Sequence, residues 1–255
     1  IQNLRIMGVL QRIALCYFFA AWLLRYISPA KVVLLCILFL AGYHLILHVF
    51  SLSQPYAVNG NAVQRLDLWL FNERHLYHER GMAFDPEGIL STMPALVNVI
   101  GGCFAGRIIL RWGRNHDCVT RLLVIGNILV IMALLWNLSL PLNKKLWTSS
   151  FVLLTLGIDF AVVGMLMFLT DLRSITTGVY FFSVFGKNPL FIYILAEIFG
   201  LLLIIPVAPS LSFYDKVNAS LYQKLVPGPL GSLLFAVSFA LLCWYTFVTS
   251  AGKRQ

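Results

Sequence analysis

The sequence is poor in charged residues. Only 11% of its 255 residues are Asp, Glu, Lys or Arg, whereas soluble domains carry about 25%. Hydrophobic residues make up 60% of the chain. This balance excludes an ordinary soluble domain, and it predicts an integral membrane protein that crosses the bilayer several times.

Negative charge is scarcer than positive charge, with 10 acidic residues, 19 basic residues and a formal net charge of +9. A nucleic-acid partner would require basic residues gathered on one polar surface. Here the basic residues are scattered between apolar runs, so we expect no nucleic-acid partner. The expected partner is the lipid bilayer, and the charges of the loops then indicate the topology.

Cysteine is also scarce, and its spacing is not that of a metal site. The sequence has no CxxC pair, and most of its five cysteines lie in apolar runs. We expect packed thiols, without a disulfide framework and without a bound metal. The five residues are Cys16, Cys36, Cys103, Cys118 and Cys243.

Several motifs of soluble enzymes are missing. The sequence contains no GxSxG, GxxxxGK[ST], GxGxxG or HExxH. Their absence leaves no basis for a hydrolase nucleophile elbow, a phosphate loop, a dinucleotide fold or a zinc-protease helix. There is no signal-peptide layout, and the first residue is Ile1 instead of Met. We therefore expect the chain to be an inner part of a longer protein.

Long apolar runs are abundant. Each is close to the ~20 residues that a helix needs to cross a bilayer, and an open strand would leave its peptide groups unpaired in lipid. We predict an all-α fold, a polytopic transmembrane helical bundle that forms a single domain over residues 1–255. The about seven predicted spans are Val9–Ile27, Val32–Phe50, Ile89–Leu110, Leu122–Leu140, Phe151–Thr170, Pro189–Val207 and Leu230–Thr249.

The short loop after the third span is the most basic one. Short loops rich in Lys and Arg stay in the cytoplasm, so this loop is predicted to be cytoplasmic. The long loop 51–88, which carries half of the acidic residues, then lies on the opposite face. The arginines of the short loop are Arg107, Arg111, Arg114 and Arg121.

The third span has a well-marked beginning. Asp85 is expected to cap its first N–H groups, Pro86 to occupy the first helical position, and Glu87 to lie at the positive end of the helix dipole. Gly102 and Gly106 have GxxxG spacing, which favours a close helix contact within the chain or between two copies. The two carboxylates indicate either the rim of a site or a capped helix of the bundle.

Two further positions suit the binding of an anion. Arg12, beside Gln11 at the edge of the first span, presents a fork that fits a phosphate or a carboxylate, although it equally suits lipid headgroups. Asn188 and Pro189 begin a later span, with Lys187 before them. A helix N-terminus attracts anions, and an ordinary cap is the alternative.

Acidic residues and histidines inside the spans are less specific. Asp159 and Glu197 are costly in hydrocarbon, so we expect them to face the bundle interior, to pair or to stay protonated. A transporter or channel would use them as a polar pathway. His44 and His48 have i, i+4 spacing, for which we expect polar helix packing. His75, in the long loop, could serve as an acid or base.

Four sequence blocks, taken together, resemble the membrane acyltransferase family typified by heparan-alpha-glucosaminide N-acetyltransferase and its bacterial relatives. The first block reads RIMGVLQRI where the family reads RIPGVLQRI. The resemblance spans nearly the whole chain. The blocks are Arg5–Ile13, Asp67 with His75–Tyr77 and Asp85–Thr92, Asn143–Ser150 and Gly186–Tyr193.

This resemblance implies an integral-membrane enzyme that transfers an acetyl group from acetyl-CoA, its donor substrate, to an amino sugar on the non-cytoplasmic side. The expected location is the bacterial inner membrane. In the family about three helices precede the first block, and the histidine assigned to acetyl transfer lies in a loop among them. No histidine of this chain matches its motif, so a catalytically incomplete scaffold is a further alternative.

The resemblance and the residue patterns together suggest a set of binding residues. Asp85 and Glu87 would fix the rim and hold the sugar or a gating loop. Asn188 and Lys187 would either order the beginning of the sixth span or contact the phosphates of CoA. A homo-oligomer is possible through the glycine face. The expected donor- or acceptor-binding residues are Arg12, Gln11, His75, Asp85, Glu87, Lys187 and Asn188, with Asp159 and Glu197 as polar residues inside the membrane.

Overall fold

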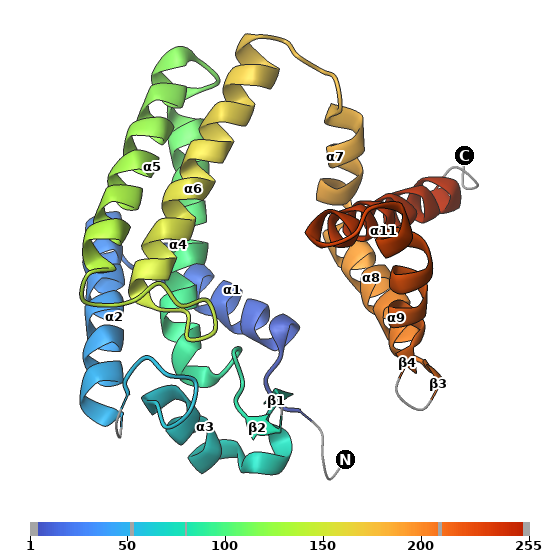
Figure 1. The fold of residues 1–255 in the computed structure, drawn as a ribbon. Coiled ribbons are helices and arrows are strands. Elements are labelled where there is room, and N and C mark those ends of the chain that lie inside the picture. Colours follow the sequence, from blue (N-terminus) through green and yellow to red (C-terminus); the bar gives the residue numbers. More distant parts are fainter. Residues whose placement is uncertain (1–4, 52–53, 80, 209–210, 252–255) are drawn as a thin grey trace. The chain divides into compact units, whose positions relative to one another are not determined.

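The structure is a computed structural model that describes residues 5–51, 54–79, 81–208 and 211–251. The chain forms two compact units, Ile1–Ser174 and Ile175–Gln255, and each is described by itself (Figure 1). Helices make up nearly all of the regular structure, which confirms the all-α prediction. The organisation of the whole chain as a single domain stays a prediction.

Long helices dominate the first unit. They are α1 (Val9–Tyr26), α2 (Pro29–Phe50), α4 (Ile89–Trp112), α5 (His116–Trp136) and α6 (Ser149–Met167), which continues as a π-helical turn, Phe168–Leu172. A short polar region links α2 to α4. It consists of α3 (Ala62–Phe71), a 3-10 turn (Glu73–His75) and the antiparallel hairpin of β1 (His78–Glu79) and β2 (Met82–Ala83).

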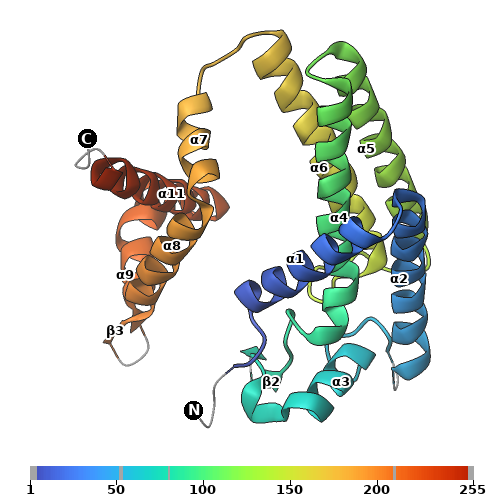
Figure 2. The same cartoon turned by 180° about the vertical axis from the view of Figure 1, so that it is seen from behind.

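The core of the first unit is centred on α4. On one side α4 contacts α5 and α6, where Leu122 and Val152 are fully buried. On another side it packs with α1 and α2 around Val32 and Ile100 (Figure 2). A third apolar cluster, which includes Phe84, lies under the polar region and holds α3 against α2. Helix α4 therefore connects every packed layer of the first unit.

Glycines allow α5 and α6 to approach closely. A Cβ atom on Gly126 would lie 2.7 Å from the backbone oxygen of Gly157, and the reverse distance is also 2.7 Å. The GxxxG pair on α4 was expected to favour a close helix contact within the chain or between two copies. Among the described residues of this chain it makes no such contact, and a contact between copies stays a prediction. A Cβ atom on Gly102 or Gly106 would meet no other atom within 4 Å. The contact is made where both helices have a glycine at the crossing point.

Membrane-crossing length is found in five helices, α2, α4, α5, α6 with its π-helical turn, and α11 (Pro229–Ala251). A sixth span is possible if the bent pair α7 (Val179–Lys187) and α8 (Pro189–Ile204) is counted as one. The predicted count of seven is therefore not confirmed. Helix α1 does form where the first span was predicted, but Arg12 and Arg25 make it less apolar than the others.

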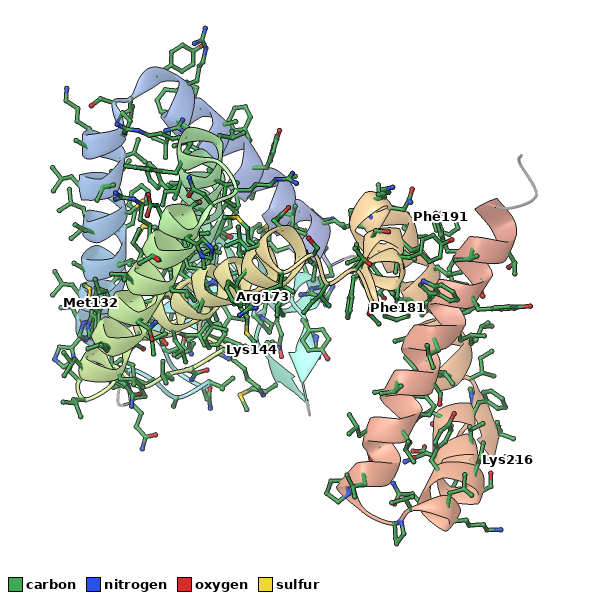
Figure 3. The ribbon with its side chains drawn as sticks, turned by 90° about the horizontal axis from the view of Figure 1, so that it is seen from above. Met132, Lys144, Arg173, Phe181, Phe191 and Lys216 are labelled. Carbon is green, nitrogen blue, oxygen red and sulfur yellow. The ribbon has the colours of Figure 1, made fainter. Side chains whose placement is uncertain are left out.

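The second unit packs its helices through aromatic rings. Phe181 of α7 lies 5.6 Å from Trp244 of α11, and Phe191 of α8 lies 5.4 Å from Phe247, between ring centroids (Figure 3). The remaining elements are β3 (Pro206–Ala208), β4 (Leu211–Ser212), α9 (Phe213–Val217), a π-helical turn (Asn218–Tyr222) and α10 (Gln223–Leu225).

Candidate functional site

The beginning of α4 differs from the sequence prediction. The helix starts at Ile89 with Gly88 as its N-cap, so Pro86 is not its first residue. Asp85 accepts a hydrogen bond from the backbone N–H of Glu87 at 3.0 Å, and it thereby closes the turn before the helix. The N–H of Ile89 instead donates to Asp67 of α3, at 3.2 Å. A carboxylate from another helix thus caps α4.

An ion-pair cluster lies directly before this helix. Arg5 donates to both carboxylate oxygens of Asp85, through Nε at 2.9 Å and Nη2 at 2.6 Å, and it also donates to Glu87. Asp85 is fully buried, so the two-pronged contact compensates its charge. The hydrogen bonds to Asp85 raise the pKa of Arg5 above its usual value. The guanidinium also lies over the ring of Tyr77, 5.0 Å from its centroid.

Arg12 joins α1 to the same region. Its guanidinium is buried and donates to two backbone carbonyl groups, that of Pro86 at 3.1 Å and that of Ser91 at 2.5 Å. The hydroxyl of Ser91 donates back to the carbonyl oxygens of Pro86 and Gly88. Arg12 Nε is buried and has no hydrogen-bond partner among the described residues. Two of the three nitrogen groups of Arg12 therefore hold the turn, and one donor is left unused.

The indole of Trp147 covers Arg12. The guanidinium carbon lies 4.6 Å from the ring centroid, a cation–π contact in a region that water does not reach. The indole N–H donates to Asn98 at 3.0 Å, and Asn98 donates to Thr155, also at 3.0 Å. This chain of contacts links α1, α4 and α6. The bond to Asn98 fixes the orientation of the Trp147 ring, and the ring in turn holds one face of the Arg12 guanidinium.

The loop that carries Trp147 is shaped by Asn143. The side-chain oxygen of Asn143 accepts the backbone N–H groups of Lys145 at 2.9 Å and Leu146 at 3.3 Å, and its amide donates to the carbonyl of Tyr56 at 3.2 Å. The resulting turn leaves Trp147 in the left-handed region with φ of 54°. The block NKKLWTSS thus serves to place one aromatic ring.

Asp67 is the most unusual acidic group of the site. Its side chain is completely buried, and burial raises the pKa of its carboxyl to about 7. One oxygen caps α4, whereas the other, Oδ2, has no hydrogen-bond partner among the residues that the structure describes. A Cβ atom on Gly88 would lie 1.9 Å from Oδ2, so only glycine fits there. A buried carboxyl that titrates near neutral pH is typical of functional sites.

The structure brings together only part of the predicted set. Arg12, Asp85 and Glu87 lie around one turn, with His75 close to Arg5 through the bond from the Ile6 N–H to the His75 carbonyl at 3.3 Å. Gln11, although adjacent to Arg12, is exposed.

The other predicted residues lie elsewhere in the fold. Asn188 is the N-cap of α8, as predicted, but it makes no side-chain cap bond, and Lys187 is the last residue of α7 instead of a loop residue. Asp159 is exposed on α6 and Glu197 on α8, each within its own unit. The expectation that they face the bundle interior, pair or stay protonated stays a prediction. No ion pair involves either acid among the described residues.

The histidines of α2 pack as polar helix residues. Trp136 donates its indole N–H to His44 Nδ1 at 3.2 Å, so in the neutral ring Nε2 carries the proton and donates to the hydroxyl of Tyr56 at 3.1 Å. Both ring nitrogens of His44 are therefore occupied. Among the described residues, no three His, Cys, Asp or Glu side chains gather in a way that would hold a metal ion.

The sequence analysis did not identify two residues of the site, Arg5 and Trp147. Arg5 was noted only as part of a sequence block, although it lies in the segment just before α1 and is the counter-charge of Asp85. Trp147 was noted only as part of the block NKKLWTSS. An apolar cavity of about 510 Å³ adjoins the cluster and is lined in part by Cys16 and Thr92.

Comparison with known proteins identifies two relatives. The chain is 31% identical over 155 residues to the human (Homo sapiens) heparan-alpha-glucosaminide N-acetyltransferase, and the match covers 55% of this chain and 23% of that protein. It is 29% identical over 154 residues to the mouse (Mus musculus) protein of the same name, over 54% of this chain and 23% of that protein. The match thus spans about a quarter of each relative's length. No family model matches the chain. The two relatives confirm the resemblance predicted from the four blocks.

Proposed function

We propose that this chain, which resembles the heparan-alpha-glucosaminide N-acetyltransferase family, is part of an integral-membrane acyltransferase that moves an acetyl group from acetyl-CoA to an amino sugar. The observation that carries the proposal is the identity of 31% over 155 residues to the human enzyme. The apolar helices of the chain fit the membrane location, for which we propose a bacterial inner membrane.

The reaction needs a neutral amine and a polarised thioester. The lone pair of the sugar nitrogen attacks the thioester carbonyl carbon, a C–N bond forms, and the C–S bond breaks as CoA leaves as a thiolate. A base must take the proton that the nitrogen loses, and donors must stabilise the negative oxygen that develops at the carbonyl. The family's catalytic histidine is not among the residues of this sequence, so we assign no base within this chain.

The contacts of the cluster suggest how this chain contributes. We propose that Arg12 meets an anionic part of the donor or acceptor through Nε, the donor that the described residues leave unused. The carboxylate of Glu87 accepts a hydrogen bond from Arg5 inside the cluster and is partly exposed. It can therefore also bond to sugar hydroxyls. Asp85 is fully paired, so its proposed role is to hold the turn that presents Glu87.

The second unit is proposed to contribute to binding of the acetyl-CoA donor. Lys187 and Asn188 lie at the break between α7 and α8, where the first N–H groups of α8 are not capped by a side chain. Such groups attract phosphate, and the lysine adds positive charge. This supports a role in contacting the phosphates of CoA.

Acetyl transfer in membranes tests the proposal. Radiolabelled acetyl-CoA and glucosamine are supplied to membranes that contain the full-length protein, and labelled N-acetylglucosamine is measured. Transfer above that of control membranes is expected, and Glu87→Gln should lower it about tenfold or more, as loss of one positioning contact does. The matched control is Glu73→Gln, which changes an exposed acid outside the cluster and should leave transfer unchanged.

Two outcomes would contradict the proposal. No transfer to any amino sugar, together with solute uptake that needs no acyl donor, would favour a transporter. Equal transfer by the Glu87→Gln protein would remove Glu87 from the site. A homo-oligomer through the open glycine face of α4 stays a prediction, because a Cβ atom on Gly102 would meet nothing within the chain.

A further inference from the structure

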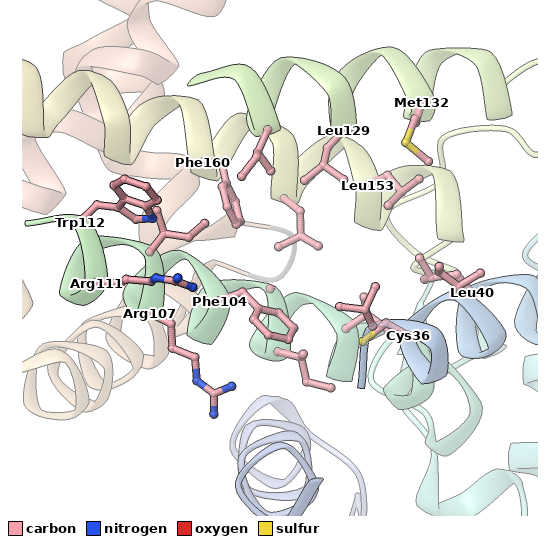
Figure 4. A pocket seen from close by; sticks show the side chains of 18 residues that line it. Cys36, Leu40, Phe104, Arg107, Arg111, Trp112, Leu129, Met132, Leu153 and Phe160 are labelled. Carbon is pink, nitrogen blue, oxygen red and sulfur yellow. The ribbon is translucent and has the colours of Figure 1, made fainter. Parts of the chain in front are cut away.

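One apolar hollow of the first unit is lined by residues outside the ion-pair cluster. It has a volume of about 570 Å³, within the ~300–1,000 Å³ of small-molecule sites, and it is walled by α2, α4, α5 and α6 (Figure 4). Its walls are almost entirely aliphatic or aromatic. The function proposed above makes no use of it.

One end of this cavity carries positive charge. Arg107 and Arg111 line it near Trp112, whereas the opposite end is lined by Leu40 and Met132, as Figure 4 shows. Both arginines belong to the last turns of α4, one helical turn apart. No carboxylate among the described residues forms an ion pair with either of them. Arg107 donates to the carbonyl of Leu24 at 3.5 Å, and the Arg111 guanidinium lies 6.0 Å from the ring centroid of Trp112. The apolar cavity thus ends at two guanidinium groups whose charge no carboxylate of the described residues neutralises.

Exposed apolar side chains border the cavity. Val33 and Ile37 of α2 and Met132 of α5 line it, and their exposed fractions are 47%, 57% and 49%. On a membrane-spanning helix an exposed apolar side chain faces hydrocarbon, so an occupant can enter sideways from the bilayer. Trp112 marks the level of the headgroups, where indole rings gather.

We propose that this groove, which we call the α2–α5 groove, binds an anionic phospholipid of the surrounding bilayer. One acyl chain lies between α2 and α5, and the headgroup phosphate is bound by Arg107 and Arg111. Guanidinium groups pair with phosphate oxygens in a forked geometry, and basic pockets between membrane helices select acidic headgroups. The two arginines favour an acidic headgroup over a zwitterionic one. The apolar channel favours a lipid with an acyl chain over a water-soluble anion.

Native mass spectrometry of the full-length protein tests this assignment. The protein is reconstituted with equal amounts of phosphatidylglycerol and phosphatidylcholine, and the lipids that stay bound on release are counted. Retention of phosphatidylglycerol is expected to exceed that of phosphatidylcholine about 25-fold, because each of the two basic residues contributes on the order of a fivefold preference for an acidic headgroup and the two factors multiply. The double variant Arg107→Gln/Arg111→Gln should lose this preference. Arg25→Gln, on an exposed arginine that does not line the groove, should keep it.

A second pair of variants tests the acyl-chain channel. Ile37→Trp places a large ring into the groove, whereas Leu34→Trp places it on the same helix outside the groove. The two positions have nearly equal exposure, 57% and 56%. We expect about a tenfold loss of bound phosphatidylglycerol for the first variant and no change for the second, with helicity unchanged in both.

Three results would overturn the proposal. The first is equal retention of the two lipids by the unmodified protein. The second is loss of lipid by the control variants to the same degree as by the test variants. The third is binding of an acyl-CoA thioester at these arginines without any retained phospholipid, which would assign the groove to a soluble donor.

Discussion

The carboxylate of Asp67 lies directly against the backbone of Gly88. One of its oxygens accepts the N–H of Ile89 at 3.2 Å, and the other is so near that a Cβ atom on Gly88 would lie 1.9 Å from it. Helix α4 therefore begins only where α3 supplies a carboxylate. The same contact with Asp67 therefore caps α4 and packs α3 of the polar region against it.

Substitution of Gly88 by alanine should be strongly destabilising. The new methyl group would collide with a buried carboxylate, and overpacking of this kind costs roughly 1–3 kcal/mol. Thermal unfolding in detergent measures the effect. Gly102→Ala is the matched control, because its Cβ atom meets nothing within 4 Å, and it should be neutral or stabilising. If Gly88→Ala unfolds at the same temperature as the control, the close contact with Asp67 does not exist in solution.

The pH dependence of stability should report on Asp67. Burial raises the pKa of its carboxyl to about 7 in the folded protein, whereas the unfolded chain titrates near its ordinary value of about 3.9. Between these values the folded state binds more protons, so the free energy of unfolding falls as pH rises. The slope is at most about 1.4 kcal/mol per pH unit, and this contribution ends above the folded pKa.

Asp67→Asn should remove that slope, because an amide does not titrate. Unfolding midpoints are measured at about pH 5 and about pH 8 for both proteins, and the change in midpoint between the two pH values is compared. The exposed residue Asp117 provides the control, and Asp117→Asn should retain the slope of the unmodified protein. An identical pH profile for the Asp67→Asn protein would show that the carboxyl is ionised throughout this range.

Loss of Arg5 should cost more than loss of a surface ion pair. Arg5→Gln leaves the buried Asp85 carboxylate without its partner, which we expect to lower the free energy of unfolding by on the order of 2–3 kcal/mol. The expected loss of unfolding free energy is smaller than for a fully buried pair, because 35% of the Arg5 side chain is exposed. Arg5→Lys keeps the charge without the two-pronged contact and should have an intermediate effect.

The matched control for Arg5 is Arg114. It pairs with Asp171 at 3.0 Å, but 73% of its side chain is exposed. Arg114→Gln should therefore change the free energy of unfolding by less than about 1 kcal/mol, as exposed pairs do. Chemical unfolding of the two variants under one set of conditions compares them. Equal losses would mean that solvent reaches Asp85 as readily as it reaches Asp171.

The contact between α5 and α6 gives a further prediction. Gly157→Ala places a Cβ atom 2.7 Å from the backbone oxygen of Gly126, and backbone atoms cannot rotate away as a side chain can. We expect a loss of about 2 kcal/mol or more, together with weaker association of the two helices. Gly106→Ala on α4, which meets no atom, should leave the unfolding midpoint unchanged or raise it. Equal midpoints for both variants would show that α5 and α6 can separate at little cost.

Much of the helical architecture could be predicted from the sequence, because spans of about 20 apolar residues have few alternatives in a membrane. The predicted span Ile89–Leu110 and the observed helix Ile89–Trp112 begin at the same residue. Helix α5 begins earlier than predicted, at His116, because Asn115 accepts the N–H of Cys118 at 2.9 Å and so caps it. Local polar residues thus extend helices beyond their apolar runs.

Contacts between distant segments could not be predicted. Asp85 was expected to cap α4 because it stands before the helix, but Arg5, 80 residues away in sequence, binds it instead. The cap comes from Asp67, which nothing in the local pattern links to Ile89. The GxxxG spacing pointed to Gly102, whereas the close approach occurs at isolated glycines of two other helices. Such pairings depend on how the helices pack, which spacing along one helix does not reveal.

The break between α7 and α8 has a consequence for the lipid around it. The two helices meet at 88°, and α7 has only 9 residues, or roughly 14 Å at 1.5 Å per residue. Neither α7 nor α8, at 16 residues, matches the ~30 Å of hydrocarbon alone, so the chain must change direction at intermediate depth. At that corner the first N–H groups of α8 receive no side-chain cap from Asn188. Hydrocarbon tails cannot solvate free N–H groups, so we expect water or a polar solute to reach Asn188.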